Sequence, residues 1–363
     1  MSEYEAANDP SLTGAPDELW ITRCPVPTAT GIALARGAFA DEFARDGLRV
    51  KTLQETTRDP RLQAQHTYHH LTGLFREGGN IPPLWARAGG VETSAVIGLT
   101  WVDERQALLA RPGSGIRSAA DLAGKRLGVS NAPSTVTDIW RAMALHGYVN
   151  VLRTVGLGPE DVRFVDIAAE AFEGQALQDR PRRAWSAEPL NALLTGEVDV
   201  IYLKGAPADY VQRAHGLEVV VDINAHPDPR ARINNGTPRP VTAHVDLVRE
   251  RPDIVARFLA VLLQASAWAA DHPDEVRAIV AAETGTDEES VRLAYGDGLH
   301  RSLDVRLTDD WIEAFGVQKN FLRDWGLIPG DIDIDRWIVA EPLQEARRLV
   351  AEGRVAPSFS HAA

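Results

Sequence analysis

Strand and helix patterns alternate through the middle of the chain, and this alternation limits the possible folds more than any other feature. Short apolar runs at 162–167, 198–203 and 217–221 predict strands, and the segments near 186–195 and 206–214 have helical spacing. Strands separated by helices favour a parallel sheet with right-handed crossovers. The sequence therefore predicts an α/β fold for this region.

Similar patterns flank this region on both sides. A helix is predicted over 28–45, a long amphipathic helix ends near Val155, and a Pro- and Gly-rich turn occupies 112–115. The predicted strands outside the middle region are residues 19–23, 48–53, 94–100, 106–111 and 240–247. The chain after this last strand is predicted to be mostly helical.

Changes in composition predict where the parts of the chain begin and end. Residues 1–16 are acidic and polar and are expected to form a flexible tail. A stretch rich in Pro, Asn and Gly at 224–240 indicates that the chain leaves the α/β region there. We therefore predict a discontinuous lobe 1, made of 17–115 and 238–363, with lobe 2, residues 116–237, inserted into it.

The charge of the chain restricts its partners. The formal net charge of −13 argues against nucleic acid or an anionic membrane as the main partner. No run approaches the roughly 20 apolar residues of a membrane span, and the N-terminus lacks the basic and apolar regions of a signal peptide. A single cysteine excludes an internal disulfide and any CxxC motif. We expect a cytoplasmic protein, a monomer, whose partner is a small anion held at a local positive site.

One short segment combines several reactive residue types. His66 is followed ten residues later by Arg76 and then by Gly78-Gly79, and the only cysteine, Cys24, ends the predicted strand at 19–23. An arginine together with freed backbone N–H groups can bind a small oxyanion. A thiol and an imidazole can move a proton or attack as a nucleophile. The pattern therefore indicates an enzyme that acts on an anionic substrate.

Each of these residues also has a structural interpretation. A lone cysteine is often a small buried hydrophobe, and an arginine is usually a solvated surface charge. The position of Cys24 favours function, because the carboxyl ends of strands face the ligand crevice in α/β folds. Gly78-Gly79 favour the same interpretation of Arg76, since glycines let backbone amides turn inward.

His66 has two alternatives to a catalytic or orienting role. It could belong to a plain surface cluster with His69 and His70. His66 and His70 are also spaced as two zinc ligands on one helix would be. No glutamate follows His66 and no third ligand is indicated, so we expect no metal.

The same residues carry a family resemblance. Cys-Pro-Val-Pro at 24–27, a His-Thr-Tyr segment at 66–68, Arg76 and Ile-Pro-Pro-Leu at 81–84 resemble the bacterial aromatic sulfinate desulfinases in residue type and spacing. The order of elements is similar over most of the chain. Two stretches depart from the family pattern, namely Thr22-Arg23 and the residues between His66 and Arg76.

The resemblance implies a function and a set of site residues. It places Cys24, His66, Arg76 and Gly79 on the family's active-site positions. It implies a cofactor-free carbon–sulfur bond hydrolase that converts an aromatic sulfinate to the desulfinated arene and sulfite. Arg76 and the Gly79 amide would hold the sulfinate, and His66 would orient Cys24 or water. Whether Cys24 protonates the ring carbon or attacks sulfur stays open.

A second resemblance concerns the fold. DLAGKRLGV at 121–129 and LLTGEVDVIY at 193–202 are typical of the sulfonate, nitrate and thiamine-precursor branch of the type II periplasmic binding proteins. This resemblance implies two α/β lobes with a ligand cleft between them. Ser134 and Thr135 would then lie at the far wall of the cleft and contact substrate, or they only cap the helix that follows.

Two other functions share the expected fold, because a fold does not fix a function. One is a non-catalytic solute-binding protein for a sulfonate or another small organic anion. The other is an enzyme of thiamine-pyrimidine synthesis, but the cysteine-rich motif of that family is absent. The missing signal peptide and the position of Cys24 favour the desulfinase.

Overall fold

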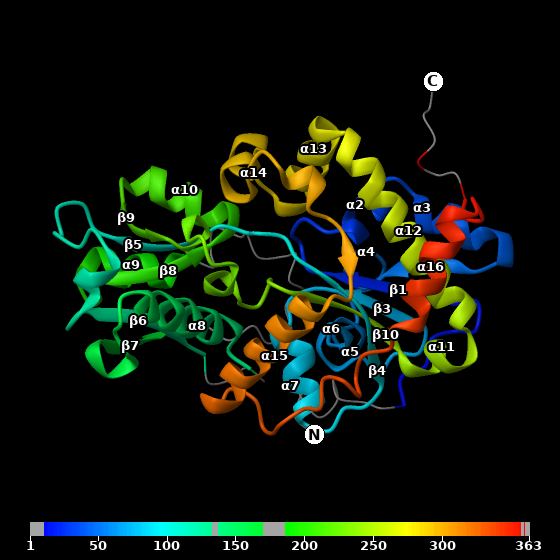
Figure 1. Cartoon of the computed structure of the whole chain (residues 1–363), viewed down its shortest axis with the longest axis horizontal. Helices are drawn as coiled ribbons and strands as arrows, with labels where there is room; N and C mark the ends of the chain where they lie inside the picture. The colour runs from blue at the N-terminus through cyan, green and yellow to red at the C-terminus, as the bar shows by residue number, and fades with distance from the viewer. Residues whose placement is uncertain (1–10, 133–136, 170–185, 357–358, 360–363) are drawn as a thin grey trace. The chain divides into compact units, whose positions relative to one another are not determined.

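The computed structural model describes residues 11–132, 137–169, 186–356 and 359. The chain divides into two compact units. Unit 1 comprises Met1–Val102, Gly236–Thr284 and Gly298–Ala363, and unit 2 comprises Asp103–Asn235 and Gly285–Asp297. Figure 1 shows the helices and strands of both units.

Unit 1 is built on a six-stranded sheet in the order β11-β4-β10-β3-β1-β2. The strands are β1 Glu18–Arg23, β2 Arg49–Thr52, β3 Leu74–Glu77, β4 Ser94–Thr100, β10 Arg239–His244 and β11 Val305–Arg306. β1 is parallel to β2 and β3, whereas β10 is antiparallel to both β3 and β4. The carboxyl ends of β1, β3 and β4 therefore lie at one edge of the sheet, the edge at which ligands usually bind.

Short helices of unit 1 follow each of its first strands. They are α2 Ala29–Ala35, α3 Ala38–Phe43, α4 Leu53–Thr56, α5 Pro60–Gln63, α6 Gln65–Tyr68 and α7 Ile81–Ala88. The single helix predicted over 28–45 is instead two helices, because Gly37 adopts a left-handed conformation with φ 72° and ends the first one.

The other helices of unit 1 come from later in the chain. They are α11 Val245–Glu250, α12 Pro252–Asp271, α13 Pro273–Thr284, α15 Asp309–Asp324 and α16 Glu341–Ala351. α12 and α16 lie side by side (Figure 1). By length and composition α12 could cross a membrane, although Arg257 lies within it and Asp253 and Asp271 lie at its two ends. Its Phe258 stacks on Phe39 and Phe75 at 4.9 and 3.9 Å, and 67% of its most apolar window is buried, so α12 is the core helix of unit 1.

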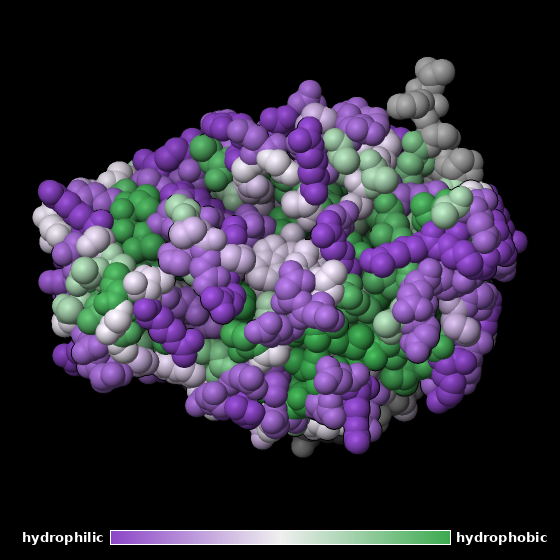
Figure 2. All heavy atoms as spheres, viewed as in Figure 1, coloured by the Kyte–Doolittle hydropathy of each residue, from purple (hydrophilic) through white to green (hydrophobic). Residues whose placement is uncertain are grey.

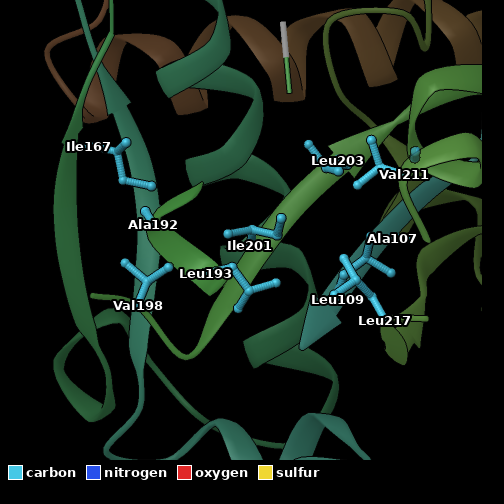
Figure 3. Packing of buried hydrophobic residues seen from close by; sticks show 11 residues of the cluster. Ala107, Leu109, Ile167, Ala192, Leu193, Val198, Ile201, Leu203, Val211 and Leu217 are labelled. Atoms are coloured by element: carbon cyan, nitrogen blue, oxygen red, sulfur yellow. The ribbon is translucent and has the colours of Figure 1, made fainter. Parts of the chain in front are cut away.

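Unit 2 contains a five-stranded sheet in the order β7-β6-β8-β5-β9. The strands are β5 Gln106–Ala110, β6 Arg126–Asn131, β7 Arg163–Ala168, β8 Val200–Lys204 and β9 Glu218–Asp222, and the helices are α8 Ile139–Thr154, α9 Ala187–Thr195, α10 Gly205–His215 and α14 Glu288–Tyr295. Leu193 of α9 packs beside Ile201 of β8 in the core of this unit (Figure 3). The sheet is mixed: β6 is parallel to β7 and β8, as predicted, but β5 is antiparallel to β8 and β9.

The division of the chain differs from the sequence expectation in two places. β5 lies in unit 2 and not in lobe 1, because its backbone pairs with β8 on one side and β9 on the other. Residues 285–297, which include α14, also lie in unit 2, where α14 packs on α10. The turn at 112–115 therefore lies within unit 2 and does not separate the units.

Polar residues cover most of the surface in view. Hydrophilic side chains occupy most of the face shown in Figure 2, with hydrophobic patches between them. Among the described residues, the large hydrophobic side chains classed as exposed are Val155, Leu194 and Leu293. The apolar residues of the chain are thus used mainly in the two cores.

Candidate active site

Cys24 lies directly after β1, at the carboxyl edge of the unit 1 sheet. Its backbone N–H donates to Glu77 O at 3.1 Å, which extends the pairing of β1 with β3 by one residue. The cysteine is partly exposed and its thiol is free. Arg76 of β3 lies opposite Thr22 of β1 in the same ladder. The parallel pairing of these two strands therefore brings the cysteine and the arginine segment together.

A backbone N–H group and an imidazole nitrogen face the sulfur of Cys24. The backbone N–H of Gly79 donates to Cys24 Sγ at 3.3 Å. Nε2 of His66 lies 3.5 Å from the same sulfur. Four of the residues selected from the sequence, including Arg76, are thus in one cluster within unit 1. Ser134 and Thr135 lie outside the described residues.

Gly78 leaves room for the sulfur. A Cβ atom at this position would lie 2.8 Å from Cys24 Sγ and 3.1 Å from Arg76 Nη2. Real Cβ atoms essentially never lie within 3.0 Å of another heavy atom, so a side chain here would displace the thiol and crowd the guanidinium.

We expect Gly78→Ala to lower kcat/KM for the natural reaction by about 10²-fold, the cost of a displacement of roughly 1 Å in a reacting group. The matched control is Gly298→Ala, because a Cβ at Gly298 meets no atom within 4 Å. Steady-state kinetics of the two variants test this. Equal activity in both would show that the packing around Cys24 has no role in turnover.

His66 is held between a hydroxyl and the thiol. It lies on α6 and is buried, with its Nδ1 2.8 Å from Thr22 Oγ1. Burial lowers the pKa of His66 well below its usual value, and the charges of Arg76 and His69 lower it further. The imidazole is therefore neutral near pH 7, so one ring nitrogen carries a proton and the other accepts. This burial contradicts the surface-cluster alternative.

Arg76 is completely buried, which contradicts the alternative that it is a solvated charge. Its Nε donates to His66 O at 2.7 Å and its Nη2 donates to Gly79 O at 2.8 Å. In the part of the chain that the structure describes, Nη1 has no hydrogen-bond partner. Burial lowers the pKa of Arg76 to about 10, and the charge on Cys24 acts in the opposite direction. The guanidinium thus holds the backbone at His66 and at Gly79, the two residues that face the sulfur, and places a positive charge near Cys24.

Thr22 and Arg23, which depart from the family pattern, contact different parts of the protein. Thr22 is fully buried and contacts His66. Arg23 forms ion pairs with Glu55 at 2.9 Å and Glu283 at 2.8 Å. Burial has the largest individual effect and lowers the pKa of Arg23. The charges and hydrogen bonds of Glu283 and Glu55 together outweigh it, so the pKa of Arg23 is raised. Paired charges of this kind explain how an arginine is accommodated beside Cys24.

The neighbouring histidines do not form the predicted alternative zinc pair. α6 ends at Tyr68 and His69 has a left-handed conformation with φ 58°, so His66 and His70 are not on one helix. His69 Nε2 lies 3.2 Å from Leu74 O, the geometry of a ring N–H donating to a carbonyl. Within the described residues no group of three His, Cys, Asp or Glu side chains could hold a metal.

The buried histidines should make stability depend on pH. Burial is the main cause that lowers the pKa of both His66 and His69. Above about pH 6.5 these histidines are neutral in both the folded and the unfolded chain, so they do not change the free energy of unfolding. Below about pH 6.5 the histidines of the unfolded chain bind protons, whereas the buried histidines of the folded chain do not. Each group should then remove up to about 1.4 kcal/mol from the free energy of unfolding per pH unit.

Urea unfolding at about pH 7.5 and about pH 5.5 tests this. The wild type is compared with His69→Asn, which removes one buried histidine; asparagine is chosen because it tolerates the left-handed conformation of residue 69. This variant should lose less stability on acidification than the wild type. The comparison cancels the effect of Glu77, whose pKa is raised by burial and whose titration acts in the opposite direction. Equal losses would show that His69 does not titrate as described.

Comparisons with known proteins agree with this architecture. The chain is 29% identical over 363 residues to the 2'-hydroxybiphenyl-2-sulfinate desulfinase of Rhodococcus erythropolis, covering 91% of this chain and 93% of the relative. Its structure matches a mutant of DSZB in complex with biphenyl-2-sulfinic acid with a TM-score of 0.70, 24% identity and coverage of 92% and 99%. It also matches the periplasmic aliphatic sulphonate binding protein SsuA of Escherichia coli with a TM-score of 0.66, 16% identity and coverage of 90% and 92%. No protein-family model matches the chain.

These findings confirm two of the sequence predictions. The resemblance to the aromatic sulfinate desulfinases extends over nearly the whole chain. The fold is a mixed α/β fold with two sheets, shared with the type II periplasmic binding proteins. The relationship between a desulfinase and a sulphonate receptor places two functional classes on one fold, and the residues around Cys24 bear on the choice between them.

Proposed function

We propose that this chain, a relative of the 2'-hydroxybiphenyl-2-sulfinate desulfinases, cleaves the C–S bond of an aromatic sulfinate and yields the desulfinated arene and sulfite. The observation that carries the proposal is the surroundings of Cys24 Sγ. The thiol faces His66 Nε2 and the Gly79 N–H, and the buried guanidinium of Arg76 lies nearby. This arrangement suits a cysteine that transfers a proton or attacks as a nucleophile. Binding alone would not need such a group.

The sulfinate would be held at the same edge of the sheet. The resemblance implied that Arg76 and the Gly79 amide hold the sulfinate. Nε and Nη2 of Arg76, however, already donate to His66 O and Gly79 O, and the side chain is buried. We infer that the Gly79 N–H, which is directed at the sulfur, donates to a sulfinate oxygen as substrate enters. Arg76 then stabilises the negative charge from behind, where low polarity strengthens its effect.

Net hydrolysis of the substrate can follow two routes. In the first, the Cys24 thiolate bonds to the sulfinate sulfur, the C–S electron pair stays on the ring carbon, and that carbon takes a proton from water. The hydroxide so formed displaces sulfite from the cysteine and restores the thiolate. In the second route, the Cys24 thiol protonates the ring carbon, the C–S electron pair returns to the ring, and sulfur dioxide leaves. The sulfur dioxide adds water to give sulfite, and the proton released in that step restores the Cys24 thiol.

The hydrogen bonds at Cys24 favour the first route. A thiolate is a strong acceptor, and the Gly79 N–H directed at the sulfur stabilises that form over the neutral thiol. Rapid quenching followed by intact-protein mass measurement separates the routes, because only the first leaves sulfur dioxide covalently attached to the protein. The hydrolase class of the enzyme rests on the water consumed in either route.

Sulfite release tests the proposed activity directly. Purified protein is incubated with 2-phenylbenzenesulfinate and with other aryl and alkyl sulfinates, and sulfite and arene are both measured. We expect both products in equal amounts from at least one aryl sulfinate, and none from Cys24→Ser. If several sulfinates bind but none yields sulfite above that control, the chain is a receptor of the sulphonate-binding type. If only non-biphenyl substrates react, the residues between His66 and Arg76 are the first place to look for altered specificity.

A further inference from the structure

We propose that Gln54 is a positioning residue that, through the Thr22 hydroxyl, fixes the tautomer of His66 with its proton on Nε2, facing Cys24. Gln54 lies on α4, outside the sequence motif, and its side chain contacts Thr22, a fully buried residue of β1. The consequence for turnover depends on the proposed desulfinase function. The tautomer itself does not, and it is measured separately below.

The orientation of the Gln54 amide is fixed by two acceptors. Nε2 of Gln54 donates to Arg23 O at 2.9 Å and to Thr22 Oγ1 at 2.8 Å. A carbonyl oxygen only accepts, so the amide nitrogen and not the amide oxygen must face Arg23 O. Oε1 of Gln54 is buried and has no partner among the described residues, so a flipped amide would gain no acceptor for its N–H groups.

This orientation determines the direction of the Thr22 proton. Because the Gln54 N–H occupies one lone pair of Thr22 Oγ1, the hydroxyl acts there as an acceptor. Its own proton then needs a second partner, and Thr22 is fully buried. In the described part of the chain, the other group at hydrogen-bond distance from Thr22 Oγ1 is His66 Nδ1, 2.8 Å away. A buried hydroxyl proton without an acceptor is strongly unfavourable, so Thr22 donates to Nδ1.

A ring nitrogen that accepts leaves the proton of a neutral imidazole on the other nitrogen. Nε2–H of His66 then faces Cys24 Sγ at 3.5 Å. Arg76 Nη2, 3.4 Å from Nε2, is the competing contact, but this distance is long for a nitrogen–nitrogen hydrogen bond and Nη2 already donates to Gly79 O at 2.8 Å. The relay thus runs from Gln54 through Thr22 and His66 to the sulfur.

The relay predicts the properties of the thiol. Cys24 Sγ receives N–H groups from both His66 and Gly79, which stabilises the thiolate. The opposite tautomer would present a lone pair to the sulfur and stabilise the thiol instead. The other titratable or charged groups that act on His66 are Arg76 and His69, and both are left unchanged by substitutions at Gln54.

Two measurements without substrate test the inference. Nitrogen-15 NMR of the His66 ring reports which nitrogen carries the proton, with His66→Gln used to identify the signals. The rate of alkylation by iodoacetamide against pH reports ionisation of Cys24 alone, because the chain has one cysteine. The variants are Gln54→Glu, Gln54→Met and Thr22→Ser. The control is Gln63→Met, which removes an amide that donates to Leu53 O and Thr57 O in the same segment but does not contact Thr22.

We expect the wild type, Thr22→Ser and Gln63→Met to have an unprotonated Nδ1. Gln54→Glu accepts the Thr22 proton, so His66 should adopt the opposite tautomer. The midpoint of alkylation should rise by about one pH unit, the effect of losing one hydrogen bond to a charged group. Gln54→Met, which adds no charge, should shift the midpoint in the same direction by less.

The outcomes distinguish this inference from the proposed function. A protonated Nδ1 in the wild type overturns the inference whether or not the protein cleaves sulfinates. The inference is also overturned if both Gln54 variants keep the wild-type His66 tautomer and the wild-type pH midpoint of Cys24 alkylation. If Nδ1 is unprotonated and the variants behave as described while no sulfinate yields sulfite, the relay stands and the desulfinase proposal fails. For an active protein, Gln54→Met should lower kcat more than it raises KM, and Gln63→Met should change neither.

Discussion

Replacement of Cys24 by serine is expected to abolish sulfite release while the fold and substrate binding are retained. The serine hydroxyl can still accept from the Gly79 N–H, which lies 3.3 Å from the sulfur, so the local backbone has no reason to rearrange. A hydroxyl is a far weaker acid and nucleophile than a thiol near neutral pH. Either route through Cys24 should therefore lose at least the ~10²-fold typical of a positioned proton transfer or nucleophile.

The measurement is sulfite formed at saturating substrate, compared with substrate binding by calorimetry. Circular dichroism and the melting temperature of the variant establish that it is folded. A variant that retains more than about a tenth of the wild-type rate would remove Cys24 from the mechanism. Loss of binding together with activity would instead indicate that the sulfur shapes the site.

The sequence was sufficient to predict which residues of the motif come together. Cys24 ends a strand, and Arg76 and Gly79 follow from a segment whose glycines and spacing indicate a turn beside it. Parallel pairing of β1 with β3 then places both at one edge, as expected for an α/β fold. The strand β3 was not itself predicted, so the ladder that places Arg76 opposite Thr22 is seen only in the structure.

The partners of these residues could not be predicted in the same way. Gln54 reaches Thr22 because α4 follows β2, the edge strand beside β1, and no spacing in the sequence indicates that neighbourhood. The engagement of Arg76 with two backbone carbonyls depends on where α6 ends. Side-chain hydrogen bonds of this kind are decided by how the chain packs locally and across the sheet, and not by a spacing that can be found in the sequence.

The error in the domain boundary has a similar origin. The strand predicted at 106–111 is observed as β5, but the Pro-Gly-Ser-Gly sequence after it suggested a boundary between lobes. Turn residues mark a change of direction and contain no information about which sheet a strand joins. β5 joins unit 2 through two antiparallel ladders, and such pairing is set by the partners β8 and β9.

Arg76→Lys should impair turnover severely although the charge is kept. The guanidinium donates in two directions, through Nε to His66 O and through Nη2 to Gly79 O. A lysine ammonium is a compact charge without the planar fork, so it cannot hold both carbonyls in this geometry. The loss of one charge-assisted hydrogen bond costs roughly 1.5–3 kcal/mol, which corresponds to about 10- to 150-fold in kcat/KM.

Arg49→Lys on the exposed edge strand β2 is the control for this substitution. Its guanidinium contacts Asp17 and Glu18, and its side chain is 60% exposed, so the exchange should leave kcat/KM unchanged. Arg76→Lys should in addition unfold at lower urea concentration, since one buried carbonyl loses its donor at a cost of about 1–3 kcal/mol. If Arg76→Lys has the wild-type kcat/KM, the two hydrogen bonds of the guanidinium have no role in turnover. A loss of stability with unchanged kcat/KM would show that Arg76 only supports the fold, whereas a loss of both is the result expected of a residue that fixes the groups facing Cys24.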